Sequence, residues 1–177
     1  MKLYPSVVQH IAHNSYADPE RLCMADSRSA FSYGEVWSRI YGLSQRLQEL
    51  GVTRERCVAV ECSQNAGYMI CEFAIQLLGG IFVPIEKNAA AGRLAEILGD
   101  TQAVLYIGKD PAKLSAALDT IQTSCGPSQH SATPGFMDIS RAADFAYAPE
   151  DIPPPGEMLF PEAQQTAEIL FSTGTTG

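Results

Sequence analysis

Basic residues are scarce in this sequence. Lys and Arg together number 12 against 20 Asp and Glu, which gives a formal net charge of −8 at pH 7 over 177 residues. A protein that binds nucleic acid or an anionic membrane surface needs clustered Lys and Arg. We therefore expect a protein that binds neither.

Apolar runs are short. The longest, from Leu77 to Ile85, is interrupted by Gly79, Gly80 and Pro84, and it falls short of the roughly 20 residues that a membrane span requires. The first ten residues, MKLYPSVVQH, lack the apolar core of a signal peptide because polar residues recur too soon. We expect a cytoplasmic protein without a membrane span.

Residue patterns typical of metal sites and catalytic centres are missing. The five cysteines show no C-x-x-C spacing, so we expect reduced thiols, with Cys62 and Cys71 as small core residues. His10 and His13 are three residues apart, but no second ligand pair lies nearby, and we predict no metal site. No Ser–His–Asp arrangement or pair of acids stands out, and we predict no catalytic residue. We expect the lysines that follow strand ends to be solvated; these are Lys87 and Lys109.

Segments typical of strands and helices alternate along the chain. Two short strands around a turn are expected at 21–26 and 29–32. Beyond them, the pattern predicts helices at 33–50, 65–80, 91–100 and 110–122 and strands at 57–62, 81–86, 103–108 and 136–139. This alternation predicts an α/β fold, with a mostly parallel sheet covered by helices on both faces.

Local signals fix several boundaries. Ser32 and Glu35 have the spacing of a capping box at a helix start, and Gly51 is a typical helix end. Pro84 places its strand at an edge, an end or a bulge of the sheet, because proline donates no backbone hydrogen bond. Residues 141–165 lack a period and contain PPPG, so we expect an irregular surface connection there.

The sequence finishes with a short apolar strand, expected at 169–171, and a run of hydroxyl residues and glycines, STGTTG. Glycines let backbone N–H groups approach a phosphate, and hydroxyls add further donors. The run has neither the G-x-G-x-x-G spacing of dinucleotide sites nor a Walker lysine. From these residues alone, a phosphate-binding loop and a frayed polar terminus both remain open.

A family resemblance favours the phosphate loop. The stretch ILFSTGTTG resembles the phosphate-loop motif of adenylate-forming enzymes, which include acyl- and aryl-CoA synthetases, adenylation domains of nonribosomal peptide synthetases, and luciferases. The upstream runs FSYGEVWSRIYGLSQRLQELGV, CVAVEC and LLGGIFVPIE are similar to that family too, so the resemblance covers residues 22–177. At Arg54–Arg56, a charged run replaces the family's usual Gly-Asp turn. The matched loop residues are Ser172, Thr173, Gly174, Thr175, Thr176 and Gly177.

The resemblance implies an activity. Residues 1–177 would be the N-terminal α/β fragment of an adenylation domain, without the rest of the large domain and the C-terminal lid domain. The parent enzyme would use ATP and Mg²⁺ to adenylate a carboxylic acid and pass the acyl group to CoA, as an acyl-CoA synthetase of fatty acid metabolism does. The fragment alone is expected to be inactive. The alternatives are a stand-alone α/β module that binds a nucleotide or anion without catalysis, and a domain that only packs.

The resemblance also implies roles for the loop residues. The hydroxyls of Ser172, Thr173 and Thr176 would donate hydrogen bonds to the β- and γ-phosphates of ATP. Gly174 and Gly177 would let the loop move, while Thr175 would hold its shape. The strand at 169–171, without a partner strand after it, is expected to be poorly ordered or to pair with a second molecule through its open edge.

Overall fold

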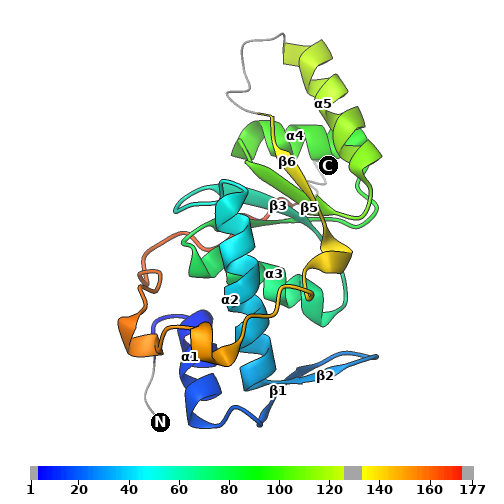
Figure 1. Ribbon diagram of the computed structural model, residues 1–177. Coiled ribbons are helices and arrows are strands. Elements are labelled where there is room, and N and C mark those ends of the chain that lie inside the picture. Colours follow the sequence, from blue (N-terminus) through cyan, green and yellow to red (C-terminus); the bar gives the residue numbers. More distant parts are fainter. Residues whose placement is uncertain (1–3, 126–132, 173–177) are drawn as a thin grey trace.

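A sheet of parallel strands forms the centre of the protein. The computed structural model describes residues 4–125 and 133–172 (Figure 1). Within these residues the sheet has four strands in the order β4-β3-β5-β6, and every adjacent pair is parallel. The strands are β3 (Cys57–Glu61), β4 (Ile81–Ile85), β5 (Leu105–Gly108) and β6 (Gly135–Asp138).

Helices cover both faces of this sheet, which confirms the predicted fold class. In Figure 1, α2 (Tyr33–Glu49) and α3 (Ala66–Leu77) lie below the sheet, while α4 (Ala91–Thr101) and α5 (Pro111–Cys125) lie above it. Successive side chains of a strand point to opposite faces. In β3, Val58 and Val60 therefore join the cluster around α2 and α3, whereas Ala59 joins the cluster around α4 and α5.

The chain adds a strand first on one side of β3 and then on the other. From β3 it passes through α3 to the neighbouring β4, and from β4 it returns through α4 over β3 to reach β5. The helices that follow β3 and β5 consequently lie on opposite faces. In parallel sheets, the crevice beyond the carboxyl ends of two such strands is the usual place for a ligand.

The helix α2 begins and packs as predicted. The Ser32 backbone N–H donates to Glu35 Oε2 over 2.9 Å, and the Glu35 N–H donates to Ser32 Oγ over 3.3 Å, which completes the capping box. Its apolar stripe is buried, and Gly51 follows the helix with a φ of 88°, a value that glycine adopts at little cost. The buried stripe consists of Val36, Ile40, Leu43 and Leu47.

A helix that we did not predict precedes the first strands. α1 (Val7–Ala17) begins at Ser6, whose hydroxyl accepts a hydrogen bond from the Gln9 N–H. Its buried residues, Val8, Ile11, Ala12 and Ser15, have helical spacing. The polar residues between them hide this pattern. After α1, the predicted strands at 21–26 and 29–32 are confirmed as the antiparallel pair β1 (Leu22–Ala25) and β2 (Ala30–Ser32).

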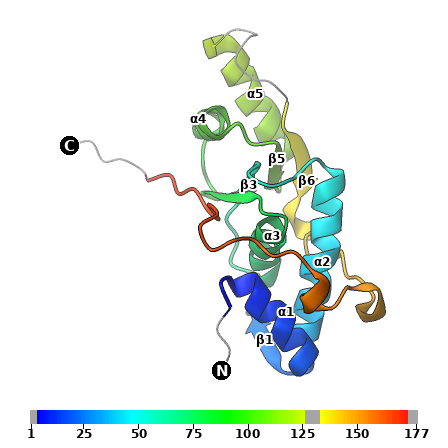
Figure 2. The same ribbon diagram turned by 90° about the vertical axis from the view of Figure 1, so that its left-hand side faces the viewer.

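The segment at 141–165 crosses the outside of α2 (Figure 2). It contains short 3₁₀ turns at Pro149–Asp151 and Pro155–Glu157 and follows another at Ile139–Arg141. The segment is not wholly superficial, because Ala142 and Ile152 are buried against the α2 side of the core.

The prediction of a strand at 169–171 is wrong. The structure has one parallel bridge there, between Phe82 and Glu168. Continuing the parallel pairing would require a hydrogen bond from residue 84 to the Ile169 carbonyl, and Pro84 has no N–H to donate. Pro84 itself lies where we predicted, since β4 is an outer strand of the sheet as described.

No helix among the described residues is long and apolar enough to cross a bilayer.

The close crossing of α2 and the 141–165 segment gives a test of packing. A methyl group added at Gly42 would collide with the backbone carbonyl of Phe145, so we expect Gly42→Ala to lower the free energy of unfolding by about 1–3 kcal/mol. At Gly99 in α4 a methyl group would meet no atom, and we expect Gly99→Ala to raise it by about 0.5–1 kcal/mol. Denaturant unfolding measures both changes. Equal effects of the two substitutions would contradict the close crossing.

Candidate functional site

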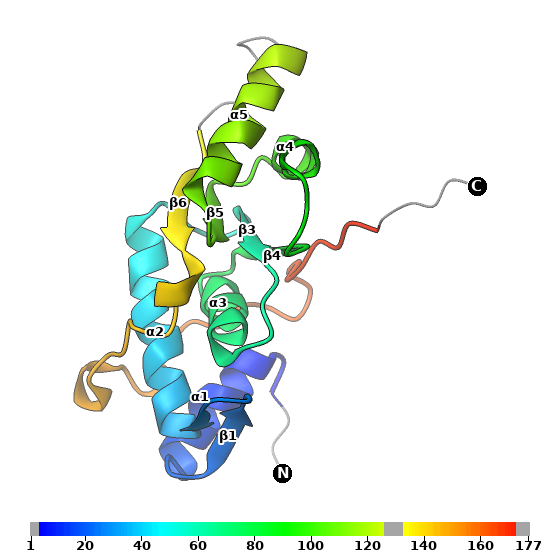
Figure 3. The same cartoon turned by 90° about the vertical axis from the view of Figure 1, so that its right-hand side faces the viewer.

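The segment that leads to the predicted phosphate loop runs beside β4. The Phe82 N–H donates to the Ala167 carbonyl over 2.9 Å, and the Ile169 N–H donates to the Phe82 carbonyl over 3.0 Å. Figure 3 shows the segment passing β4 and continuing outward. The start of the loop is therefore held by backbone hydrogen bonds to an outer strand.

Side chains from α4 hold the same segment further along. Ile169 and Phe171 pack against the apolar cluster of α4 and α5. The guanidinium of Arg93 lies 5.7 Å from the centre of the Phe171 ring, and its Nη2 donates to the Ser172 carbonyl over 3.4 Å. A second contact, 3.0 Å from Nη1 to Glu96, fixes the orientation of Arg93. The chain thus reaches Ser172 at a defined place beside α4.

One of the predicted loop residues lies in the described part of the structure. Ser172 is exposed. The other five predicted residues lie outside the described residues, and their roles stay predictions. They are Thr173, Gly174, Thr175, Thr176 and Gly177.

A buried polar cluster lies at the carboxyl edge of the sheet, between β3 and β5. Glu61 at the end of β3 is only 7% exposed. The Tyr106 hydroxyl donates to Glu61 Oε2 over 2.8 Å, and Lys113 Nζ lies 3.7 Å from the same oxygen. Burial, followed by the hydrogen bond to Glu61, raises the pKa of Tyr106, so the phenol stays protonated as the donor. Lys113 also donates to the Lys87 carbonyl over 3.4 Å, which ties the loop after β4 to α5.

Our sequence reasoning missed this cluster. An acidic residue at the end of the otherwise apolar run CVAVE was the available signal. A charged residue at the end of a buried strand requires a partner, but the sequence does not show that Tyr106 and Lys113 supply it. The predicted exposure of Lys87 and Lys109 is confirmed, since both are exposed.

A cavity of about 500 Å³ adjoins this edge. Its lining includes Cys62, whose Sγ lies 3.4 Å from the Tyr68 hydroxyl. Burial raises the pKa of Tyr68, and it raises the pKa of the Cys71 thiol to about 12. Tyr68 therefore offers a hydrogen bond, and Cys71 is a core thiol, as predicted. The same prediction is wrong for Cys62, which is half-buried at the cavity. The cavity is lined by Cys62, Ser63, Gln64, Tyr68 and Lys87.

The chemistry available at this edge is binding by hydrogen bonds and charge. Within residues 4–125 and 133–172, no group of three or more His, Cys, Asp or Glu side chains is placed to hold a metal ion. The residues described above can hold a polar ligand and stabilise charge.

The known family of AMP-binding enzymes matches residues 11–177 of the chain. Human mitochondrial malonate–CoA ligase ACSF3 is 26% identical over 166 residues, which cover 89% of this chain and 27% of the ligase. Enterobactin synthase component F of Escherichia coli K12 is 24% identical over 168 residues, which cover 94% of this chain and 11% of the synthase. The chain therefore spans about a quarter or less of the length of these relatives.

Solved structures share the fold at lower identity. The N-terminal subdomain of Klebsiella oxytoca NpsA superposes with a TM-score of 0.70 at 18% identity, covering 97% of this chain and 40% of that subdomain. The N-terminal domain of FACL13 from Mycobacterium tuberculosis superposes with a TM-score of 0.69 at 16% identity, covering 96% of this chain and 42% of that domain. The α/β arrangement described above is thus the arrangement of these N-terminal parts.

The role of Arg93 can be tested against a matched arginine. Arg93 and Arg46 each contact a glutamate three residues ahead on a helix, but Arg93 also contacts Phe171 and Ser172. We expect Arg93→Gln to accelerate hydrogen exchange of the Ile169 amide about two- to fivefold. The substitution removes the contacts of Arg93 with Phe171 and Ser172, and the effect is small because these contacts are exposed and therefore weak. Arg46→Gln should leave that rate unchanged. An Ile169 amide insensitive to Arg93→Gln would show that α4 does not hold the segment.

The pair Glu72 and Glu168 predicts a pH dependence. Partial burial, and then the negative charge of Glu168, raise the pKa of Glu72 above its ordinary value. The folded state therefore binds this proton more tightly than the unfolded state, so stability rises as pH falls through the raised pKa and levels off below the ordinary value. We expect Glu72→Gln to increase the free energy of unfolding at pH 7 and to flatten this slope. Glu49→Gln, at an exposed position, is the control; an unchanged slope in Glu72→Gln would refute the assignment.

Proposed function

The chain belongs to the family of AMP-binding enzymes, and we propose that it forms the N-terminal part of the adenylation domain of an AMP-forming acid–thiol ligase. In the first step, a carboxylate oxygen of the substrate attacks the α-phosphorus of ATP. The bond from that phosphorus to the bridging oxygen breaks, and the products are an acyl-adenylate and pyrophosphate. In the second step, a thiol attacks the acyl carbon, releases AMP and loses its proton, which gives a thioester.

The observation that carries this proposal is the match of the family to residues 11–177, a span that includes the run STGTTG. A substrate carboxylate is already ionised at pH 7, so the first step needs no general base. The demand is to stabilise the charge that develops on the leaving pyrophosphate. Hydroxyl groups and glycine N–H groups meet that demand, and Mg²⁺ bound to ATP would supply the positive charge.

We assign the roles within the loop on this chemistry. Ser172, Thr173 and Thr176 donate hydrogen bonds to the β- and γ-phosphates. Gly174 and Gly177 allow the backbone to approach and follow the phosphates. Thr175 holds the loop in shape. The contacts of Arg93 with Phe171 and Ser172 support this assignment, because they fix the end from which the loop starts.

CoA is the acceptor that we propose. Of the two relatives compared above, the malonate–CoA ligase has the slightly higher identity, 26% against 24%, and its name specifies CoA as the acceptor. The substrate class is then a carboxylic acid converted to its CoA thioester, as in the activation of fatty acids. The rate at which AMP is released from the acyl-adenylate distinguishes the two acceptors. We expect CoA to accelerate this release more than a pantetheine-bearing carrier protein does.

The loop assignment is tested by exchange of labelled pyrophosphate into ATP, with a panel of carboxylic acids and the full-length protein that contains this chain. We expect Thr173→Val and Thr176→Val each to lower the acid-dependent exchange rate by about ten- to a hundredfold, since each removes one donor to developing charge. Thr120→Val, which removes an exposed hydroxyl on α5, should have no effect. Exchange that persists unchanged in both loop variants would contradict the assignment. Exchange catalysed by residues 1–177 alone would contradict the proposal that the catalytic apparatus extends beyond this part.

A further inference from the structure

Two helices beside the sheet carry a cation in an unfavourable place. Arg93 is the third residue of α4, and Lys113 is the third residue of α5. The partial positive charge of a helix N-terminus disfavours a cation there, and neither helix has an acidic residue in its first turn. Both side chains reach beyond their own helix. Arg93 contacts Ser172, while Lys113 contacts Glu61 at the end of β3 and Lys87 after β4.

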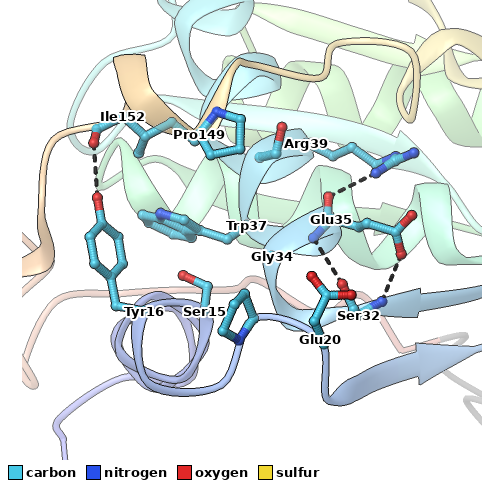
Figure 4. Close-up of a pocket in the computed structure, with 12 residues that line it drawn as sticks. Ser15, Tyr16, Glu20, Ser32, Gly34, Glu35, Trp37, Arg39, Pro149 and Ile152 are labelled. Atoms are coloured by element: carbon cyan, nitrogen blue, oxygen red, sulfur yellow. Dashed lines mark hydrogen bonds between the residues drawn. The ribbon is translucent and has the colours of Figure 1, made fainter.

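The start of α4 has little local support. Ala90 at the N-cap position provides no side-chain hydrogen bond, and Gly92 in the first turn weakens a helix by its conformational freedom. Figure 4 shows the contrast in α2, where Ser32 and Glu35 satisfy each other's backbone N–H groups. A helix that lacks such a cap is less stable at its start. The first turn of α4, which carries Arg93, therefore depends on contacts from outside the helix.

Lys113 supplies one of these contacts. Its Nζ donates to the carbonyl oxygen of Lys87 over 3.4 Å, three residues before the N-cap position of α4. A turn leads from Lys87 towards the helix, in which the Ala89 N–H donates to the Glu86 carbonyl over 2.9 Å. The ammonium group of Lys113 thus ties the segment between β4 and α4 to the first turn of α5.

Glu61 holds Lys113 in this place. Its Oε2 lies 3.7 Å from Lys113 Nζ and accepts the hydrogen bond from the Tyr106 hydroxyl over 2.8 Å. The Tyr106 side chain is fully buried, and its ring occupies the space beside Gly108, where an added methyl group would collide with the phenol. Because the carboxylate and the phenol both belong to buried strands, Glu61 is a fixed negative charge that orients the lysine.

We propose that Glu61 and Lys113 are positioning residues for the phosphate loop. They fix the segment before α4, and this segment supports the first turn of the helix. Arg93 in that turn holds Phe171 and Ser172, where the loop begins. The inference rests on the proposed function, because it concerns the same loop. In this role neither Glu61 nor Lys113 touches a substrate. A loop whose start is already fixed loses less conformational entropy when ATP binds.

Variants of the full-length protein that contains this chain separate positioning from stability. Lys113→Met leaves the Glu61 carboxylate buried without its cation, and we expect a lower melting temperature. The double variant Glu61→Gln/Lys113→Met removes both charges, and glutamine still accepts the hydrogen bond from Tyr106. We expect the double variant to recover most of the lost stability, although it still lacks the contact with Lys87. Lys109→Met, which removes an exposed lysine at the same edge of the sheet, is the control.

The readout is exchange of labelled pyrophosphate into ATP at varied concentrations of ATP and of the carboxylic acid. We expect the double variant to raise the KM for ATP about two- to fivefold, as suits a partly exposed contact, and to leave the KM for the acid unchanged. A loss of folded protein would instead lower the maximal rate and change neither KM. Lys109→Met should also change neither KM.

Arg93→Gln tests whether the positioning residues act through Arg93. We expect it to raise the KM for ATP by a factor similar to that of the double variant. Combining Arg93→Gln with the double variant should bring no further rise, because the substitutions interrupt one chain of contacts. Effects that multiply would show that Glu61 and Lys113 do not act through Arg93, and would overturn the proposal.

Amide hydrogen exchange separates a failure of this inference from a failure of the proposed function. If no acid supports pyrophosphate exchange in the unsubstituted protein, the ligase proposal fails. The positioning is then decided by the Ile169 amide, whose exchange the double variant should accelerate about two- to fivefold. An Ile169 amide that exchanges at the same rate in the double variant refutes the positioning. An unchanged KM for ATP in an active double variant refutes it as well.

Discussion

Pairing of β3 with strands on both sides is the constraint on which the rest of the structure depends. All five residues of β3 are buried, and the strand is parallel to β4 and to β5. A strand in this position must be apolar on both faces, and each face must then be covered by helices. The two helix layers and the two apolar clusters follow from that. So does the common edge where the carboxyl ends of the strands meet, with Glu61 at its centre.

Much of this architecture could be predicted from sequence because local and global signals agree. Ser32 and Glu35 define a helix start through contacts three residues apart, and Pro84 places its strand at an edge by lacking a donor. Each of these signals determines the structure of residues only a few positions away along the chain. The failures were of another kind. The pairing at 169–171 depends on which residue of β4 lies opposite, and sequence alone did not show that Pro84 would lie there.

The same limit applies to the candidate sites. The run STGTTG could be found in the sequence because its residues are consecutive. The residues around Glu61 could not, since Tyr106 and Lys113 reach it only after β5 and α5 have packed. Sites assembled across the fold need the fold first.

The absent N–H of Pro84 also bears on aggregation. An outer strand with free donors and acceptors can recruit a strand from another molecule. In β4 the outward-facing groups of Phe82 are occupied by Ala167 and Ile169, and Pro84, two residues on, cannot donate. A foreign strand would therefore find no continuous ladder to extend along this edge. The residue that ends the pairing of the chain with itself is thus also an obstacle to pairing with a second molecule along β4.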